Sequence, residues 1–311
     1  MTRVACIGEC MIELRQAPGG LYSRSFGGDT LNTAVYLARL GIDVDYITAL
    51  GDDTLSDEMI GGWQAEGVGT AKVPRLKGKL PGIYMIETNE WGERRFFHWR
   101  DSAAARELMD LPQTDEILQS LASYEVVYFS AITLSIFNPE GRAKMLGALR
   151  SAREQGARIA FDTNFRARGW RDRDEVRGAF EEAFATSDIV LASTEDMLPV
   201  YPDETDEQLI QRAGCKEAIL KLLDPGSIVS FEGALHRVAP EPVTNPVVDT
   251  TAAGDSFAAA YIAARLDGAD PIQSARAGHH LAGVVVCYPG AIIPRSAMPT
   301  EADSNPREAL R

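Results

Sequence analysis

Small residues and a carboxylate lie together near the C-terminal end of the chain, in the run DTTAAGD at 249–255. The Ala-rich pattern that follows is helical, so we expect the backbone N–H groups of Ala252, Ala253 and Gly254 at a helix N-terminus. Such a terminus suits phosphate oxygens, small side chains let a phosphate approach, and Gly254 permits a φ that other residues disfavour. Asp255 is then placed to accept the proton of an attacking hydroxyl. The run indicates phosphoryl transfer, and an Asp-containing N-cap before an ordinary core helix is the alternative.

Overall composition narrows the class of protein. The chain has 311 residues, 45% of them hydrophobic, and a formal net charge of -14, which argues against a nucleic-acid partner. No stretch approaches the roughly 18 uninterrupted apolar residues of a membrane span, and the N-terminus runs directly into a strand. We therefore expect a soluble protein with no membrane partner and no signal peptide. The four cysteines lack Cys-x-x-Cys spacing and there are only four His residues, which favours a reduced, cytoplasmic setting over a zinc site.

Short apolar runs alternate with longer helical patterns along the chain. Strands are expected at 4–8, 46–50, 126–130, 158–162, 189–192 and 228–231, and helices at 31–40, 142–155, 176–185, 257–266 and 272–286. Repeated alternation of strand and helix predicts an α/β fold with a mainly parallel central sheet and helices on both faces. We expect one domain over 1–299 and a loose C-terminal tail over 300–311.

One interval departs from this alternation. Two β-type runs, at 82–88 and 94–100, are joined by a short turn that contains glycine, which predicts a hairpin too small to have its own core. With 21–26, the hairpin is expected to form a small β-sheet that lies over the main domain as a lid. Apolar strands of this kind tend to be covered by a partner, so we expect a homo-oligomer, most simply a two-fold dimer through the lids. The apolar side chains of the hairpin include Ile83, Met85, Phe96 and Phe97.

Two common nucleotide-binding fingerprints are missing from the sequence. There is no Gly-x-x-x-x-Gly-Lys-[Ser/Thr], and no Gly-x-Gly-x-x-Gly follows the first strand. Instead, the run GGDTLN at 27–32, together with the DTTAAGD turn, resembles the ribokinase-like (PfkB) family of carbohydrate kinases, over essentially the whole chain from Val4 to about Pro299. The resemblance implies a ribokinase-like three-layer sandwich with a small β-sheet lid. It also implies ATP as the phosphoryl donor, accompanied by Mg²⁺.

Further motifs are similar to those of family members that phosphorylate 2-keto-3-deoxygluconate. They are GECMIEL at 8–14, FGGDTLNT at 26–33, LPGIY at 80–84, FHWR at 97–100, DTNFR at 162–166 and GAIIPR at 290–295. The resemblance implies transfer of the γ-phosphoryl group of ATP to the 6-hydroxyl of this sugar acid. The rivals are another sugar kinase of the same fold, acting on fructose or on 2-keto-3-deoxygalactonate, and a non-catalytic sugar or nucleotide sensor. Asp255 speaks against the sensor, and two arginines in these motifs favour an acid sugar over a neutral one.

Candidate substrate residues follow from the chemistry of a sugar acid. Such a substrate needs hydrogen-bond donors and acceptors together with at least one guanidinium. Asn32 offers both a donor and an acceptor, and Arg100 and Arg166 supply positive charge for the carboxylate. Packing or surface roles are the alternatives for each. The expected substrate residues are Gly28, whose backbone would approach the sugar, Asn32, Tyr84 and His98 from the lid, Arg100, Arg166 and Asp255.

Candidate metal residues lie in two segments that match the family pattern incompletely. The family uses an Asn-x-x-Glu element to organise Mg²⁺ through water, and the matching positions here run from Ser193, which replaces the amide, to Asp196, which keeps a carboxylate. Monovalent cations in this family bind near the turn that corresponds to 249–255, which we term the phosphate turn, and Asp249 and Thr251 stand in that segment. Whether K⁺ is bound is left open.

Candidate nucleotide residues complete the set. Family members commonly carry a Lys-x-Gly step beside the nucleotide, and Lys221 lacks the glycine that would supply a backbone contact. The helix that follows Pro271, including Ala277, is expected on the adenine side. The expected nucleotide contacts are Ser193, Lys221, Ala252, Gly254, Gly278 and His280.

Overall fold

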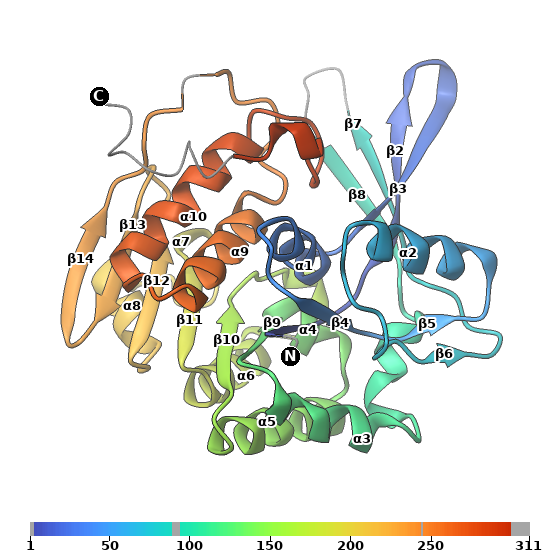
Figure 1. Cartoon of the computed structure of the whole chain (residues 1–311), viewed down its shortest axis with the longest axis horizontal. Helices are drawn as coiled ribbons and strands as arrows, with labels where there is room; N and C mark the ends of the chain where they lie inside the picture. The colour runs from blue at the N-terminus through green and yellow to red at the C-terminus, as the bar shows by residue number, and fades with distance from the viewer. Residues whose placement is uncertain (1–2, 89–93, 244, 300–311) are drawn as a thin grey trace.

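A central eight-stranded sheet runs through the molecule in the order β14-β13-β12-β11-β10-β9-β1-β4 (Figure 1). The computed structural model describes residues 3–88, 94–243 and 245–299. The strands are β1 (Val4–Ile7), β4 (Val44–Ile47), β9 (Val126–Ser130), β10 (Arg158–Asp162), β11 (Ile189–Ser193), β12 (Glu217–Lys221), β13 (Ser227–Phe231) and β14 (Ala234–Val238). Neighbours from β4 to β12 pair in parallel, and β13 and β14 add an antiparallel edge. The predicted mainly parallel sheet is confirmed.

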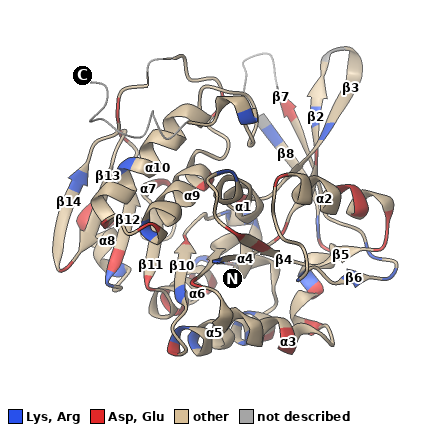
Figure 2. Cartoon of the chain, viewed as in Figure 1, with Lys and Arg blue, Asp and Glu red and all other residues tan. Residues whose placement is uncertain are grey.

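Helices cover both faces of this sheet, which makes three layers (Figure 1). They are α1 (Asp29–Arg39), α2 (Thr54–Ala65), α3 (Thr114–Gln119), α4 (Ala131–Ile136), α5 (Pro139–Glu154), α6 (Arg173–Thr186), α7 (Thr194–Met197), α8 (Asp206–Arg212), α9 (Ala253–Leu266) and α10 (Pro271–Val285). Successive side chains of a strand point to opposite faces. On β9, Val127 and Phe129 pack toward α5 and α6, whereas Val126 and Tyr128 pack toward α1 and α9. Charged residues lie mainly on helices and at strand ends (Figure 2).

A separate four-stranded sheet, in the order β3-β2-β7-β8, projects from one side of the molecule (Figure 1). Its strands are β2 (Met11–Ala17), β3 (Leu21–Gly27), β7 (Ile83–Thr88) and β8 (Arg94–Trp99). The predicted small sheet is confirmed, and β2 joins it as a strand that the sequence analysis did not predict. The hairpin turn and the tail at 300–311 fall outside the described residues, so the division into one domain and a tail stays a prediction.

Short elements connect these layers. They are β5 (Leu50–Gly51), β6 (Arg75–Leu76) and the 3-10 turns η1 (Pro18–Gly20), η2 (Ala104–Asp110), η3 (Ser120–Ser123), η4 (Ala167–Gly169) and η5 (Arg295–Ala297). Across the described ranges, no helix combines the length and apolar character needed to cross a membrane.

Candidate active site

The phosphate turn leads into α9 through a left-handed residue. Ala252 is the N-cap, with φ 59° and ψ 15°, a conformation that costs a residue with a side chain about 1 kcal/mol. The prediction of an unusual φ at Gly254 is wrong, because Gly254 lies within the first turn of the helix. A Cβ on Gly254 would lie 3.4 Å from the Nζ of Lys221, so the glycine leaves the space beneath that ammonium clear.

The amides of this turn are only partly free. The N–H of Ala253 donates to the carbonyl oxygen of Thr250 at 3.2 Å, so the prediction of an unpaired donor there is wrong for this conformation. The N–H groups of Ala252 and Gly254 have no acceptor within the described part of the chain. Together with the helix dipole, they leave a place where an anion is favourable.

Asp255 occupies the first turn of α9 beside that place. Its side chain is buried, and its Oδ2 accepts a hydrogen bond from the Nδ2 of Asn32 at 2.8 Å. The pKa of Asp255 is raised to about 8, mainly by burial and then by the negative charge of Asp29; the charge of Asp162 also raises it, whereas the bond from Asn32 and the charge of Lys221 lower it. A carboxylate with such a pKa is well matched to accept a proton near neutral pH.

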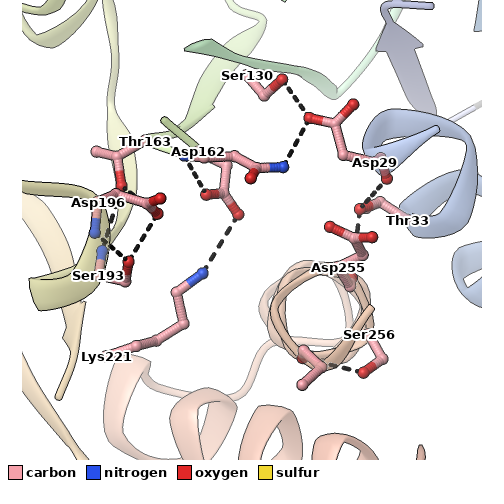
Figure 3. A network of polar contacts seen from close by, with 12 residues as sticks. Asp29, Thr33, Ser130, Asp162, Thr163, Ser193, Asp196, Lys221, Asp255 and Ser256 are labelled. Carbon is pink, nitrogen blue, oxygen red and sulfur yellow. Dashed lines mark hydrogen bonds and ion pairs between the residues drawn. The ribbon is translucent and has the colours of Figure 1, made fainter. Parts of the chain in front are cut away.

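Two further carboxylates, on Asp29 and Asp162, lie near Asp255, the first turned toward Ser130 and the second toward Lys221 (Figure 3). Asp29, at the start of α1, accepts hydrogen bonds from Ser130 and, at 2.9 Å, from Asn164. Asp162 ends β10, and burial raises its pKa. The sequence analysis missed both residues as site residues. Two sequence signals point to these residues: Asp162 stands at the end of a parallel strand, and Asp29 directly follows the glycine pair.

Lys221 ends β12 and reaches across to Asp162. Its Nζ lies 3.4 Å from the Oδ2 of Asp162 and 5.9 Å from the centre of the Phe257 ring. The structure therefore brings Lys221 close to the phosphate turn through its position beside Gly254. Its contact with a nucleotide stays a prediction.

Helix α10 carries the residues that are expected on the adenine side, and each of them has contacts within the protein. A Cβ on Gly278 would lie 2.7 Å from the ring of Phe257, so this glycine packs α10 against α9. His280 lies 3.3 Å from a carboxylate oxygen of Glu241, and its adenine role, like that of Gly278, stays a prediction. His279, which the sequence analysis did not name, contacts Ser227 at 2.9 Å, and burial followed by the charge of Lys221 lowers its pKa to about 4.

In both segments that are predicted to bind metal ions, the carboxylates accept hydrogen bonds from other protein groups. Asp196 accepts from the hydroxyl of Ser193 at 2.6 Å and from the N–H of Phe165 at 2.9 Å, which ties together the loops after β10 and β11. Asp249 accepts from the N–H of Thr251 and from that of Gly290, both at 2.9 Å. These residues lie in organised turns, and their metal contacts stay predictions.

The predicted lid residues make contacts within the small sheet and at its base. Tyr84 donates a hydrogen bond to Glu13 and stacks on His98, with ring centres 5.9 Å apart. Arg100 pairs with the buried carboxylate of Glu9, a partner that the sequence analysis missed.

The two remaining predicted substrate residues, Arg166 and Gly28, differ in their surroundings. Arg166 is largely exposed, donates to the carbonyl of Phe165 at 2.7 Å and lies 3.5 Å from Asp196. A Cβ on Gly28 would lie 2.3 Å from the carbonyl oxygen of Glu9, so packing within the protein already requires this glycine. Contact of either residue with a sugar stays a prediction.

Three buried polar atoms near the lid lack a partner within the described ranges. They are the Oε1 of Glu9, the Oδ1 of Asn32 and the Nε of Arg100. A buried polar atom without a partner costs about 1 to 3 kcal/mol. These atoms therefore mark where a polar ligand would be stabilised. Asn32 connects them to the candidate base, because its Nδ2 donates a hydrogen bond to Asp255.

Comparisons with known proteins agree with this arrangement. A family model described as "pfkB family carbohydrate kinase" matches residues 1–298. The 2-dehydro-3-deoxygluconokinase of Dickeya dadantii is 44% identical over 305 residues, which cover 95% of this chain and 98% of that protein. The enzyme of the same name from Haemophilus influenzae is 35% identical over 307 residues, covering 96% and 98%.

Solved structures show the same fold. A 2-dehydro-3-deoxygluconokinase from Thermotoga maritima superposes with a TM-score of 0.81 at 24% identity, covering 94% of each chain. A fructokinase with bound ATP from Xylella fastidiosa gives 0.83 at 20% identity, covering 98% of this chain and 97% of that one. At such identities the likeness establishes the ribokinase-like fold alone.

Proposed function

This chain belongs to the pfkB family of carbohydrate kinases, and we propose that it transfers the γ-phosphoryl group of ATP to the 6-hydroxyl of 2-keto-3-deoxygluconate, also called 2-dehydro-3-deoxygluconate. The product is 2-keto-3-deoxy-6-phosphogluconate, an intermediate of the Entner-Doudoroff route. Relatives at 35 to 44% identity over nearly the full length carry the name of this activity. The observation that carries the proposal is the buried Asp255, with its pKa raised to about 8 beside a helix N-terminus.

The transfer needs few groups. Asp255 accepts the proton of the sugar 6-hydroxyl, and the oxygen of that hydroxyl forms a bond to the γ-phosphorus of ATP. At the same time the bond from the γ-phosphorus to the bridging oxygen breaks, and ADP leaves. The amides at the start of α9 and the ammonium of Lys221, which lies beside Gly254, would stabilise negative charge on the phosphates. Asn32 holds Asp255 in place and presents its free Oδ1 to the sugar.

Cations are proposed to accompany the nucleotide. Bound Mg²⁺ would neutralise phosphate charge, and Asp196 would hold it through water, since both carboxylate oxygens already accept protein hydrogen bonds. In the described ranges no three His, Cys, Asp or Glu side chains gather as a metal site, so the phosphates would supply further ligands. The proposed K⁺ position is the turn at Asp249 and Thr251.

The setting and assembly of the protein are also proposals. Four free cysteines suit a reducing, cytoplasmic location. Exposed apolar side chains on the lid support a two-fold dimer through the lid strands. They are Leu21, Tyr22, Phe96 and Trp99.

Two alternative functions are tested against this proposal. A kinase for fructose or 2-keto-3-deoxygalactonate would share the fold, and a sensor would bind without turnover. ADP release should be measured with the purified chain, ATP and Mg²⁺ over acid and neutral sugars, with a sugar-free control for basal hydrolysis. We expect the highest kcat/KM with 2-keto-3-deoxygluconate and phosphate at its 6-position. A higher value with fructose or the galactonate-derived acid would reassign the substrate, and no turnover with any sugar would favour the sensor.

A further inference from the structure

Asp29 is a buried carboxylate that the transfer itself does not use. We propose that Asp29 is a positioning residue whose negative charge makes Asp255 a stronger proton acceptor. The inference rests on the proposed function, in which Asp255 is the base. The two neighbouring carboxylates then have unequal roles, because hydrogen-bond donors surround Asp29 and do not surround Asp255.

The surroundings of Asp29 complement a negative charge. Its carboxylate accepts a hydrogen bond from the hydroxyl of Ser130, at the end of β9 (Figure 3). It accepts another from the side-chain amide of Asn164, in the loop after β10. Asp29 is also the first residue of α1, where the helix dipole favours an anion. Among the residues that the structure describes, Asp255 has a single side-chain donor, Asn32.

Helix α1 holds the two carboxylates in a fixed relation. The hydroxyl of Thr33 lies 3.2 Å from the carbonyl oxygen of Asp29 and 3.3 Å from that of Asp255. Asn32 donates to the side chain of Asp255 from the same helix. Since α1 carries Asp29 and contacts α9 at these points, the distance between the charges is set by helix packing rather than by a mobile side chain.

Asp29 is the charge near Asp255 that lacks an ionic counterpart in the described site. Within the described ranges, the titratable groups whose charges act on Asp255, or on which its charge acts, include Asp29 and Tyr36 from α1, Tyr128 from β9, Asp162 from β10 and Lys221 from β12. Asp162 and Lys221 lie 3.4 Å apart, so their opposite charges partly offset each other at Asp255. The pKa values of both tyrosines are raised, so they are neutral near pH 7. After burial, the charge of Asp29 is the largest cause that raises the pKa of Asp255.

The charge affects the rate in a predictable direction. The base must be unprotonated to act, so kcat/KM rises with pH through the pKa of Asp255 in the free enzyme. Removing the charge of Asp29 lowers that pKa. The rising limb of the profile then moves to lower pH, and the plateau rate falls because the base is weaker.

The test compares pH profiles of wild type, Asp29→Asn and Asp29→Glu. Asparagine keeps the shape and an acceptor oxygen but removes the charge, whereas glutamate keeps the charge. We expect Asp29→Asn to move the midpoint of the rising limb down by about one pH unit and to lower the plateau several-fold. Asp29→Glu should retain a midpoint near that of wild type. Asp45→Asn, on β4 and bonded to Tyr124, removes one charge outside the site and should leave the midpoint unchanged.

A second readout separates this inference from the proposed function. The titration of Asp255 can be followed without substrates by carbon NMR of labelled aspartate, with Asp255→Asn to assign the signal. Its midpoint should fall in Asp29→Asn whether or not any sugar is turned over. Should Asp29→Asn not fold, Asp29→Ser supplies a second neutral variant. An unchanged Asp255 midpoint in a folded neutral variant overturns the inference, whereas a wild type inactive on 2-keto-3-deoxygluconate overturns the proposed function.

Discussion

Arg100 and Arg166 stand in similar motifs, but their surroundings differ. The Arg100 side chain is 19% exposed and pairs with Glu9, which is 1% exposed, whereas the Arg166 side chain is 62% exposed and lies 3.5 Å from Asp196. A buried carboxylate already offsets the charge of Arg100, so we expect Arg166 to attract a sugar carboxylate more strongly. The net charge of -14 repels an acid at long range, so this attraction must act at short range.

Arg166→Ala should therefore raise KM for 2-keto-3-deoxygluconate by about 10-fold to 100-fold, which corresponds to roughly 1.5 to 3 kcal/mol for a charge-assisted hydrogen bond. The reacting hydroxyl lies at the other end of the sugar, so kcat should change little. Steady-state kinetics with acid and neutral sugars measure the effect. Arg171→Ala, which removes an exposed arginine bonded to Glu175, is the matched control. An equal penalty for both kinds of sugar would show that Arg166 serves the phosphates or the fold.

At the residue scale, the sequence predicts positions better than partners. The turn before Asp255 could be predicted because small residues and the helical pattern are local signals. The bond from Asn32 to Asp255 joins residues 223 positions apart, and the pairing of Arg100 with Glu9 joins residues 91 apart. Such pairs depend on tertiary packing, which one sequence does not specify. The strain at Ala252 was missed because glycine was the expected left-handed residue.

At the scale of elements, the packing of α9 against α10 supports the proposed nucleotide side of the site. The ring of Phe257 on α9 lies beneath the ammonium of Lys221. Gly278 on α10 leaves room for that ring, because it has no side chain. His279 packs edge-on against the same ring, with centres 5.0 Å apart. The position of Lys221 thus depends on a close approach of the two helices.

Gly278→Ala should destabilise the protein by about 1 to 3 kcal/mol, because its Cβ would lie 2.7 Å from the buried Phe257 ring. Gly283→Ala on the same helix is the matched control, since its Cβ would make an ordinary contact at 3.5 Å with Val243. Alanine is the better helix former, so this control should be neutral or stabilising by up to about 1 kcal/mol. Urea unfolding measures both, and equal effects of the two substitutions would refute the close-packing argument.

Elements with strong local patterns were predicted, and those with mixed patterns were missed. The central strands were recognisable because burial on both faces requires nearly continuous apolar runs. Strand β12 was missed because Glu217 and Lys221 stand at its ends, and Glu217 is buried through its pairing with Arg265. Strand β2 was missed because its pairing with β3 and β7 is specified by the assembled lid.

At the scale of the whole molecule, the lid exposes several large apolar side chains. Leu21 and Trp99 are 68% and 59% exposed, although each lies in a strand of the four-stranded sheet. Large apolar side chains on strands of this kind mark a surface that another chain covers. A two-fold arrangement would bury the same patch on both copies.

The protein should therefore sediment as a dimer or larger oligomer at micromolar concentration. The double substitution Leu21→Ser and Trp99→Ser should shift it toward monomer, because the apolar contact is lost. Leu223→Ser, at a residue 67% exposed but outside the lid, is the matched control and should leave the mass unchanged. A wild type that is only monomeric under these conditions would rule out the lid dimer.

The central claim is that Asp255 takes the proton of the sugar hydroxyl, and Asp255→Asn tests it most directly. Asparagine keeps an acceptor oxygen for Asn32 but cannot act as a base. We predict that kcat falls by about 10²-fold or more while calorimetry shows that ATP still binds. A variant with near-normal kcat would contradict the account, because the proton would then have another acceptor.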